Sequence, residues 1–212
     1  MRGLTDLGGR GLAATFTAVG KVRPTRKPLH PRGALFSAAV ERCGLDEPVG
    51  VPWIDEPGRT TALVRLSRAT GLPPSLPDIH GMALRIPIDG AGHADVLLAT
   101  TGIGRISRFV LFPAGSADHR AYTTLIPYET RIGALNLAAL PVRDEARTFD
   151  LACAHATGRW RTFARMHLEE LPPEDSPSFD PVLNTLPGMA YYDWATRLRE
   201  RSYRGARRSR DD

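Results

Sequence analysis

The sequence predicts a β-rich (α+β) fold, namely a single antiparallel eight-stranded β-barrel accompanied by a few helices. Eighteen prolines in 212 residues leave little room for long helices, because proline breaks a helix interior. Short apolar runs recur along the chain, and Gly, Pro and Asp residues with good turn chemistry separate them. Most gaps between runs are too short for the helix that a parallel crossover needs, so we expect an antiparallel meander.

Eight segments have the length and apolar content of strands. The last of them, residues 159–169, alternates charged and apolar side chains, which is typical of a strand with one buried and one wet face. Strands that close on themselves leave no exposed sheet edge and can enclose a ligand. The predicted strands are residues 34–40, 61–66, 82–88, 95–100, 122–127, 133–142, 148–156 and 159–169.

We expect the rest of the chain to form one domain with these strands. Residues 1–26 are interpreted as an N-terminal helix or arm, and residues 27–170 contain the barrel. Within the barrel region, residues 101–119 are rich in Gly, Ser and Arg and predict a loop or a short helix. A proline-rich wrapping loop is predicted over residues 171–190, followed by a basic C-terminal helix over residues 191–212.

Composition excludes several classes of protein. With 42% hydrophobic and 24% charged residues, the chain is not disordered, collagen-like or a coiled coil. It contains no run long and apolar enough to span a membrane, so we expect no membrane partner. Cys43 and Cys153 lack metal-ligand spacing and are too few for a disulfide framework, which favours a reducing, cytoplasmic location.

Positive charge is concentrated at the C-terminus. The net charge is +5, and seven arginines lie between Arg197 and Arg210 with only Glu200 in opposition. Three interpretations remain open: a solvated helix face, a surface for nucleic acid or membranes, or side chains that hold an anionic ligand. The lack of a recognised nucleic-acid module and the 7% aromatic content argue against nucleic acid.

Four segments carry the candidate site. Lys27-Pro28-Leu29-His30-Pro31-Arg32-Gly33 places a histidine at the mouth of the first strand, three residues after a cation. The second strand ends in Val64-Arg65-Leu66-Ser67, and the third begins in Asp78-Ile79-His80-Gly81-Met82-Ala83-Leu84-Arg85. The terminal helix contains Arg199-Glu200-Arg201-Ser202-Tyr203, with Arg210 seven residues later. In this order the segments resemble the haem catalase superfamily.

The resemblance lies in individual positions. The family's distal histidine stands in a basic-x-x-His-x-(Lys/Arg)-Gly motif, which His30 and Gly33 fit, with Lys27 where an arginine is usual. A Val-Arg-Phe-Ser strand of the family is similar to residues 64–67, and its Asp-x-Arg-Gly-x-Ala-(Leu/Ile)-Lys motif is similar to residues 78–85 with two conservative departures. The chain therefore looks like a small member of the superfamily that keeps the barrel and the proximal helix.

On the distal side, the resemblance implies a pocket for peroxide above haem b. His30 would take the proton from peroxide and return it to the departing oxygen, which assists cleavage of the O–O bond. Ser67 would hydrogen-bond that imidazole and fix its tautomer. The alternatives are that His30 is a structural histidine and that Ser67 satisfies a turn.

On the proximal side, the resemblance makes Tyr203 the iron ligand. Tyrosine binds ferric haem as a phenolate, and the Arg199 guanidinium one helical turn earlier favours the anion. The alternative is that Tyr203 packs its ring at the helix end. The haem propionates need cations, and the resemblance assigns Lys27, Arg65 and, further along the chain, Arg210 to them.

The sequence also departs from the family. The distal asparagine is missing, and only the hydroxyls of Thr100 or Thr101 stand near its place, which puts efficient catalatic turnover in doubt. Residues 204–206 differ from the Pro-Asp-Thr that usually follows the proximal tyrosine. The family's long arm and C-terminal domain are missing, so a homo-oligomer can form but not the arm-exchanged tetramer. The more open site would suit a larger peroxide or an organic substrate.

Together these features predict a catalase-like haem b protein with peroxide-dependent oxidoreductase activity, peroxidase-like or weakly catalatic. Two alternatives remain. The barrel can work without haem as a binding or structural module, which the missing asparagine favours. The arginine-rich tail can bind nucleic acid, in which case affinity would fall steeply with salt.

Overall fold

The computed structural model describes residues 33–69, 75–90, 92–172 and 177–195. The chain divides into two compact units, one of Met1–Pro28 with Tyr192–Asp212 and one of Leu29–Tyr191. The β-barrel belongs to the second unit. In the first unit only residues 192–195 are described, and there the Ala195 N–H donates to the Tyr192 carbonyl at 2.9 Å, as in a helical turn.

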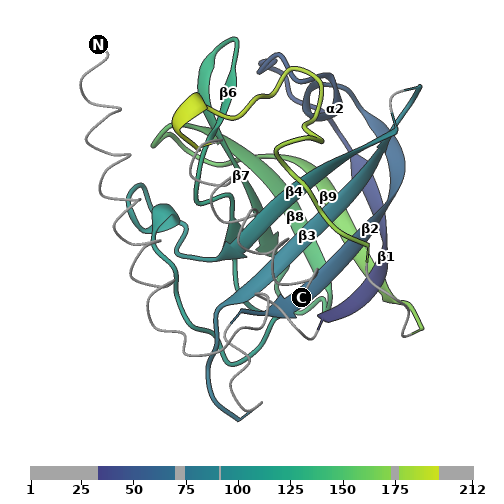
Figure 1. The fold of residues 1–212 in the computed structure, drawn as a ribbon, viewed down its shortest axis with the longest axis vertical. Coiled ribbons are helices and arrows are strands. Elements are labelled where there is room, and N and C mark those ends of the chain that lie inside the picture. The colour runs from purple at the N-terminus through teal and green to yellow at the C-terminus, as the bar shows by residue number, and fades with distance from the viewer. Residues whose placement is uncertain (1–32, 70–74, 91, 173–176, 196–212) are drawn as a thin grey trace, which may run out of the picture. The chain divides into compact units, whose positions relative to one another are not determined.

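Nine antiparallel strands form one sheet, and the sheet closes on itself (Figure 1). Because β5 and β6 both pair with β7, they occupy one position in the ring, and eight positions make up the closed barrel. The strands are β1 (Gly33–Arg42), β2 (Gly58–Arg68), β3 (His80–Ile88), β4 (Gly92–Thr100), β5 (Tyr122–Thr123), β6 (Tyr128–Thr130), β7 (Gly133–Pro141), β8 (Thr148–His155) and β9 (Arg161–Glu170).

The predicted fold class is confirmed. Each predicted strand has its counterpart, with ends that differ by at most three residues, except for residues 122–127, where β5 and β6 share one position with a break between them. Pro127 has no N–H to give to the ladder. Thr124 keeps the two sides together, since its N–H donates to the Leu137 carbonyl and its hydroxyl accepts the Leu137 N–H.

The interior of the barrel follows from the alternation along each strand. Phe36, Val64, Leu84 and Val96 stand side by side across β1 to β4, and all four side chains are buried. Across the ring, the Tyr122 and Phe149 rings meet edge to face with centroids 6.1 Å apart. Aromatic and branched side chains thus fill the barrel, and their neighbours in sequence face outward.

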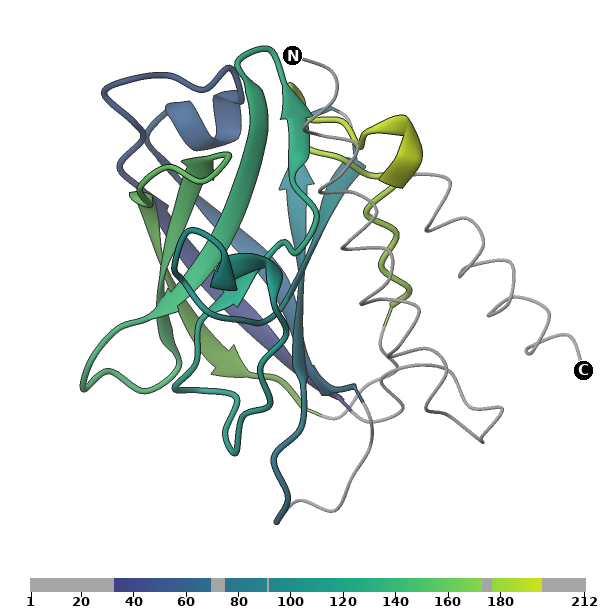
Figure 2. The same ribbon diagram turned by 90° about the vertical axis from the view of Figure 1, so that its left-hand side faces the viewer.

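Helix α2 (Pro52–Asp55) lies at one end of the barrel (Figure 2). Trp53 and Ile54 are buried, and the Trp53 ring meets Phe163 edge to face at 5.7 Å. The Asp55 carboxylate accepts the backbone N–H groups of Val49, Gly50 and Val51 at 2.7–2.9 Å. These bonds hold the turn before the helix against the last residue of the helix.

The predicted loop or short helix of residues 101–119 contains the 3-10 helix η1 (Ser107–Phe109). Arg108 is 2% exposed and donates to the carbonyls of Gly104, Ala156 and Gly158. Its guanidinium also lies 4.3 Å from the centroid of the Trp160 ring. Arg108 therefore joins this loop to the turn between β8 and β9.

In the described part of the chain, no helix is long and apolar enough to cross a membrane.

The two cysteines give a direct test of this barrel. Cys153 is fully buried, and burial raises the pKa of its thiol to about 11, whereas Cys43 is exposed. Because the thiolate is the reactive form, iodoacetamide should modify Cys43 of the native protein and leave Cys153 intact. Mass spectrometry before and after unfolding in urea would measure this. Rapid native labelling of Cys153 in a Cys43→Ser variant would contradict the packing described here.

Candidate functional site

The structure describes two of the sequence-predicted site residues, Arg65 and Ser67, both on β2. Their side chains alternate with those of Val64 and Leu66, which belong to the buried core, so Arg65 and Ser67 share the outer face of the barrel. The other predicted site residues, Lys27, His30, Arg199, Tyr203 and Arg210, lie outside the described residues, and their roles stay predictions.

Small residues line the outer face of β1 to β4 around Ser67. Strand pairing places Gly33, Ser67, Gly81 and Ala99 in one row across the four strands, and Ala83 stands opposite Arg65 in the next row. We call these five residues the small-residue face. The Ser67 hydroxyl donates to the Gly81 carbonyl at 3.4 Å. With short side chains at each of these positions, a flat group can approach the sheet closely.

Arg65 places a positive charge at one side of the small-residue face. Its side chain passes over Gly33: a Cβ at that glycine would lie 2.8 Å from the arginine Nε and 2.8 Å from the Leu66 carbonyl oxygen. Burial lowers the pKa of the Arg65 guanidinium. This contact explains why the predicted histidine motif ends in glycine, at Gly33, because any side chain at that position would displace Arg65.

Neither of the two threonines near the missing asparagine replaces its amide. Thr100 pairs with Tyr122, whose ring is in the core, so Thr100 faces the interior, where its hydroxyl accepts the His80 N–H at 3.1 Å. The Thr101 hydroxyl lies 3.0 Å from the Gly102 carbonyl and 2.8 Å from the Thr123 hydroxyl. The single hydroxyl hydrogen of Thr101 is therefore donated to a neighbouring group of the protein.

A buried carboxylate that the sequence reasoning did not single out lies beside the small-residue face. Asp95 of β4 is fully buried and makes a bidentate pair with Arg85 of β3, with both N–O distances 2.8 Å. The Asp180 N–H and the Asn184 side-chain amide also donate to Asp95, at 2.8 and 3.2 Å. We call this set of contacts the Asp95 junction. Local pattern gave no signal for it, because the partners are far apart in sequence.

Residues 177–190 of the predicted wrapping loop and Tyr191, which was predicted to begin the C-terminal helix, form a segment that we call the strap. It runs along the outer face of β3 and β4 (Figures 1 and 2). Beyond the Asp95 junction, Leu186 is fully buried. Ala190 then exchanges two backbone hydrogen bonds with Glu129 of β6. The Tyr191 hydroxyl donates to the Tyr128 hydroxyl at 3.1 Å. The strap is therefore held at both ends.

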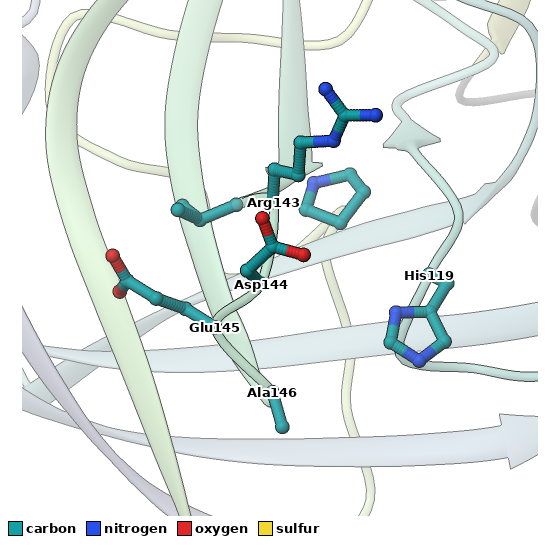
Figure 3. Close-up of a pocket in the computed structure, with 7 residues that line it drawn as sticks. His119, Arg143, Asp144, Glu145 and Ala146 are labelled. Carbon is teal, nitrogen blue, oxygen red and sulfur yellow. The ribbon is translucent and has the colours of Figure 1, made fainter.

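A separate hollow lies beside the turn between β7 and β8 (Figure 3). It has a volume of about 590 Å³, and His119 faces the turn residues Arg143, Asp144 and Glu145 across it. Neither of the two described site residues, Arg65 and Ser67, lines this hollow. Among the described residues, no group of three or more His, Cys, Asp or Glu side chains is arranged to hold a metal ion. The hollow therefore adds nothing to the candidate site.

Comparisons with known proteins agree with this architecture. No family model and no curated protein matches the chain. Among solved structures, a fungal catalase matches with a TM-score of 0.61 and 13% identity, over 90% of this chain and 60% of that one. A bacterial catalase matches with a TM-score of 0.61 and 12% identity, over 94% of this chain and 60% of that one. The chain has a catalase-like fold, as its motifs predicted, and spans 60% of the length of these catalases.

The close approach at Gly33 predicts an effect of substitution. Gly33→Ala should lower the free energy of unfolding by about 1–3 kcal/mol, because its Cβ would overlap the Leu66 carbonyl and the Arg65 side chain. Urea unfolding would measure this. Gly115→Ala is the matched control, since a Cβ there meets nothing within 4 Å, and it should change little. Equal stability of the two variants would refute the packing of Arg65 over Gly33.

The Asp95 junction predicts a pH dependence. Burial raises the pKa of Asp95, but hydrogen bonds from Arg85, Asp180 and Asn184, together with the Arg85 charge, outweigh this and hold the pKa below its usual range. A carboxyl whose pKa is lowered by folding stabilises the fold above its unfolded value of about 3.9 and loses that contribution as pH falls through the folded value. The stability advantage of wild type over Asp95→Asn should therefore be full at neutral pH.

The same advantage should decline as pH falls from about 4, where the unfolded carboxyl takes up a proton, through the lowered pKa of folded Asp95. Urea unfolding of both proteins between neutral and acidic pH would measure the difference. The other ionisable side chains at the junction are Arg85 and His93, with Asp180 on the strap. Arg85 stays charged throughout, because its pKa is raised, and His93 and Asp180 are present in both proteins. If the difference in the free energy of unfolding between the two proteins stays constant down to acidic pH, a charged Asp95 is not its source.

Proposed function

We propose that the protein binds haem b and uses it for peroxide-dependent oxidation, as a peroxidase or a weak catalase. One observation carries the proposal: on a catalase-like barrel, the outer face of β1 to β4 joins small side chains to one partly buried arginine. Haem presents a flat apolar ring with carboxylates at one edge. When bound, it would supply an iron centre that can react with peroxide.

The described residues suit such a ligand. Gly33, Ser67, Gly81, Ala83 and Ala99 have side chains short enough for a flat ring to lie next to the sheet. Arg65 supports a propionate: a cation whose charge burial disfavours is stabilised by an incoming anion, and a guanidinium can bind a carboxylate through two parallel hydrogen bonds. Lys27 and Arg210 are proposed as further propionate partners on the motif alone.

Ser67 can orient the distal histidine. Its hydroxyl hydrogen is directed at the Gly81 carbonyl, so its oxygen offers lone pairs as an acceptor. An imidazole N–H that donates to this oxygen would leave the second ring nitrogen as the base. We therefore assign His30 the proton transfer and Ser67 the choice of tautomer.

On the other side of the ring, Tyr203 is proposed as the iron ligand, with Arg199 favouring its phenolate form.

The arrangement of the threonines bears on the reaction type. Because Thr100 faces the barrel core and the hydrogen of Thr101 is already used, no described side chain of this segment supplies the amide donor of catalases. We therefore expect peroxide to oxidise a second, organic substrate faster than it is disproportionated.

An absorption spectrum tests the proposal. The full chain, purified with haem supplied, should show a Soret band, and Tyr203→Phe should weaken haem affinity by more than about tenfold because the iron loses its ligand. Tyr192→Phe is the matched control and should retain the band. A colourless wild type would favour the haem-free binding or structural module instead. Binding of nucleic acid that falls with salt, and is lost when residues 197–212 are removed, would favour the arginine-rich tail.

A further inference from the structure

The loop between β4 and β5 presents a group of apolar side chains to water. Of the seven large apolar side chains that are exposed in the described part of the chain, four belong to this loop: Ile103, Ile106, Val110 and Phe112. Ile103 is 53% exposed and Ile106 is 78% exposed. We call residues 103–106, all four of which are exposed, the isoleucine tip. Single exposed apolar residues are ordinary, but a group of them indicates an interaction surface.

The isoleucine tip is held in one conformation by the residues that flank it. The N–H groups of Gly102 and Val110 donate to the Ser107 carbonyl at 3.2 and 3.0 Å. The Gly104 N–H donates to the Ser107 hydroxyl at 3.0 Å, and the Gly104 carbonyl accepts the backbone N–H of the buried Arg108. Because the backbone is fixed on both sides of the tip, little conformational freedom remains to be lost when the tip binds a partner.

The charge around the tip is positive. The two segments that meet at Arg108, residues 96–117 and 151–168, contain no Asp or Glu. Burial lowers the pKa of the Arg108 guanidinium, and the charge of Arg105 lowers it further. Arg105 itself lies between the two isoleucines and forms no ion pair with a described residue. The apolar tip thus carries an unbalanced cation.

The turn between β8 and β9 adds a second cation beside the tip. The Trp160 indole N–H donates to the Ile103 carbonyl at 2.8 Å, which joins the turn to the tip. Arg159, the residue before this tryptophan, is exposed. Glu47 approaches the same region, but it pairs with Arg161 at 3.5 Å and balances that charge. A partner of this surface therefore needs an apolar part and a negative charge.

The remaining parts of the chain have the wrong charge for this surface. Residues 1–32 contain seven Lys or Arg and one Asp, and residues 196–212 contain seven Arg and three acidic residues. Like charges repel, so neither segment complements the tip. A bilayer with anionic lipids does, because it offers negative headgroups directly above hydrocarbon. A bilayer is also fluid, so a protruding tip needs no matching groove.

We propose that the isoleucine tip docks the barrel on a membrane surface that contains anionic lipids. Ile103 and Ile106 enter the boundary between headgroups and acyl chains, and Arg105 and Arg159 lie against the headgroups. The sequence-based expectation of no membrane partner rested on the lack of a spanning run, and a peripheral contact of this kind requires none. The inference goes beyond the proposed function and does not depend on haem.

Co-sedimentation of the full chain with vesicles tests the apolar part. Wild type should bind vesicles made of equal parts of phosphatidylserine and phosphatidylcholine more tightly than vesicles of phosphatidylcholine alone. The double variant Ile103→Ser, Ile106→Ser should bind the mixed vesicles more than about tenfold more weakly, because the two isoleucines no longer leave water. Leu183→Ser is the matched control, since this leucine of the strap is 75% exposed, and it should bind as wild type does.

The same assay tests the charge. Arg105→Gln should weaken binding to the mixed vesicles by about fivefold, the effect of one cation near an anionic surface. Arg143→Gln is the control, because it removes an exposed arginine from the turn between β7 and β8, at the opposite end of β8 from Trp160. Urea unfolding should give each variant the stability of wild type, since all the substituted side chains are exposed.

A fluorescent label separates insertion of the tip from adsorption through the basic ends of the chain. In a Cys43→Ser background, Ile106→Cys carries a polarity-sensitive fluorophore, and Leu183→Cys carries it in the control. Mixed vesicles should shift the emission of the label at position 106 to shorter wavelength and leave the label at position 183 unchanged. No shift at position 106 would overturn the inference.

Three further outcomes would also overturn it. Vesicle binding that the double isoleucine variant leaves unchanged would assign the contact to other parts of the chain. Equal binding to both kinds of vesicle would exclude recognition of anionic lipids. A wild type that binds neither, but self-associates in sedimentation equilibrium through the isoleucines, would make the tip a contact between two copies of the chain.

Discussion

Closure of the sheet between β5 and β7 is the constraint on which the rest of the structure depends. Tyr122 and Thr123 pair with β4 on one side and with β7 on the other, which gives every strand of the ring two neighbours. An eight-stranded barrel has an interior just wide enough for side chains, and Tyr122 and Phe149 help to fill it. The filled interior therefore leaves the outer face, where Arg65 and the small-residue face lie, as the place for the proposed ligand.

The sequence was sufficient for the fold because strand signals are local. The alternation of residues 159–169 reappears as β9, and a spacing of two residues puts Arg65 and Ser67 on one face of β2. The break between β5 and β6 was not predicted, since it depends on how Thr124 bonds to Leu137 across the ladder. Catalase-like motifs led to the same architecture that the solved catalases share with this chain.

The candidate site was less accessible to sequence reasoning. Asp95 becomes important only through Asp180, 85 residues later in the chain, and no periodicity encodes such a contact. The inward orientation of Thr100 was predictable, because side chains alternate along a strand and Leu98, two residues earlier, is buried. The hydrogen bonds that occupy the Thr101 hydroxyl depend on contacts that no sequence spacing reveals. The first finding concerns how the strap is held to the sheet, and the second limits the distal chemistry of the proposed haem site.

In the proposed function, the outer face holds a flat ligand whose carboxylate meets Arg65. Titration of wild type and Arg65→Ala with haem and with haem dimethyl ester, followed by the Soret band, tests it most directly. The account predicts that esterification weakens binding to wild type by about tenfold or more and has a much smaller effect on Arg65→Ala, because the lost interaction is the same in both cases. Equal effects of esterification on the two proteins would contradict it.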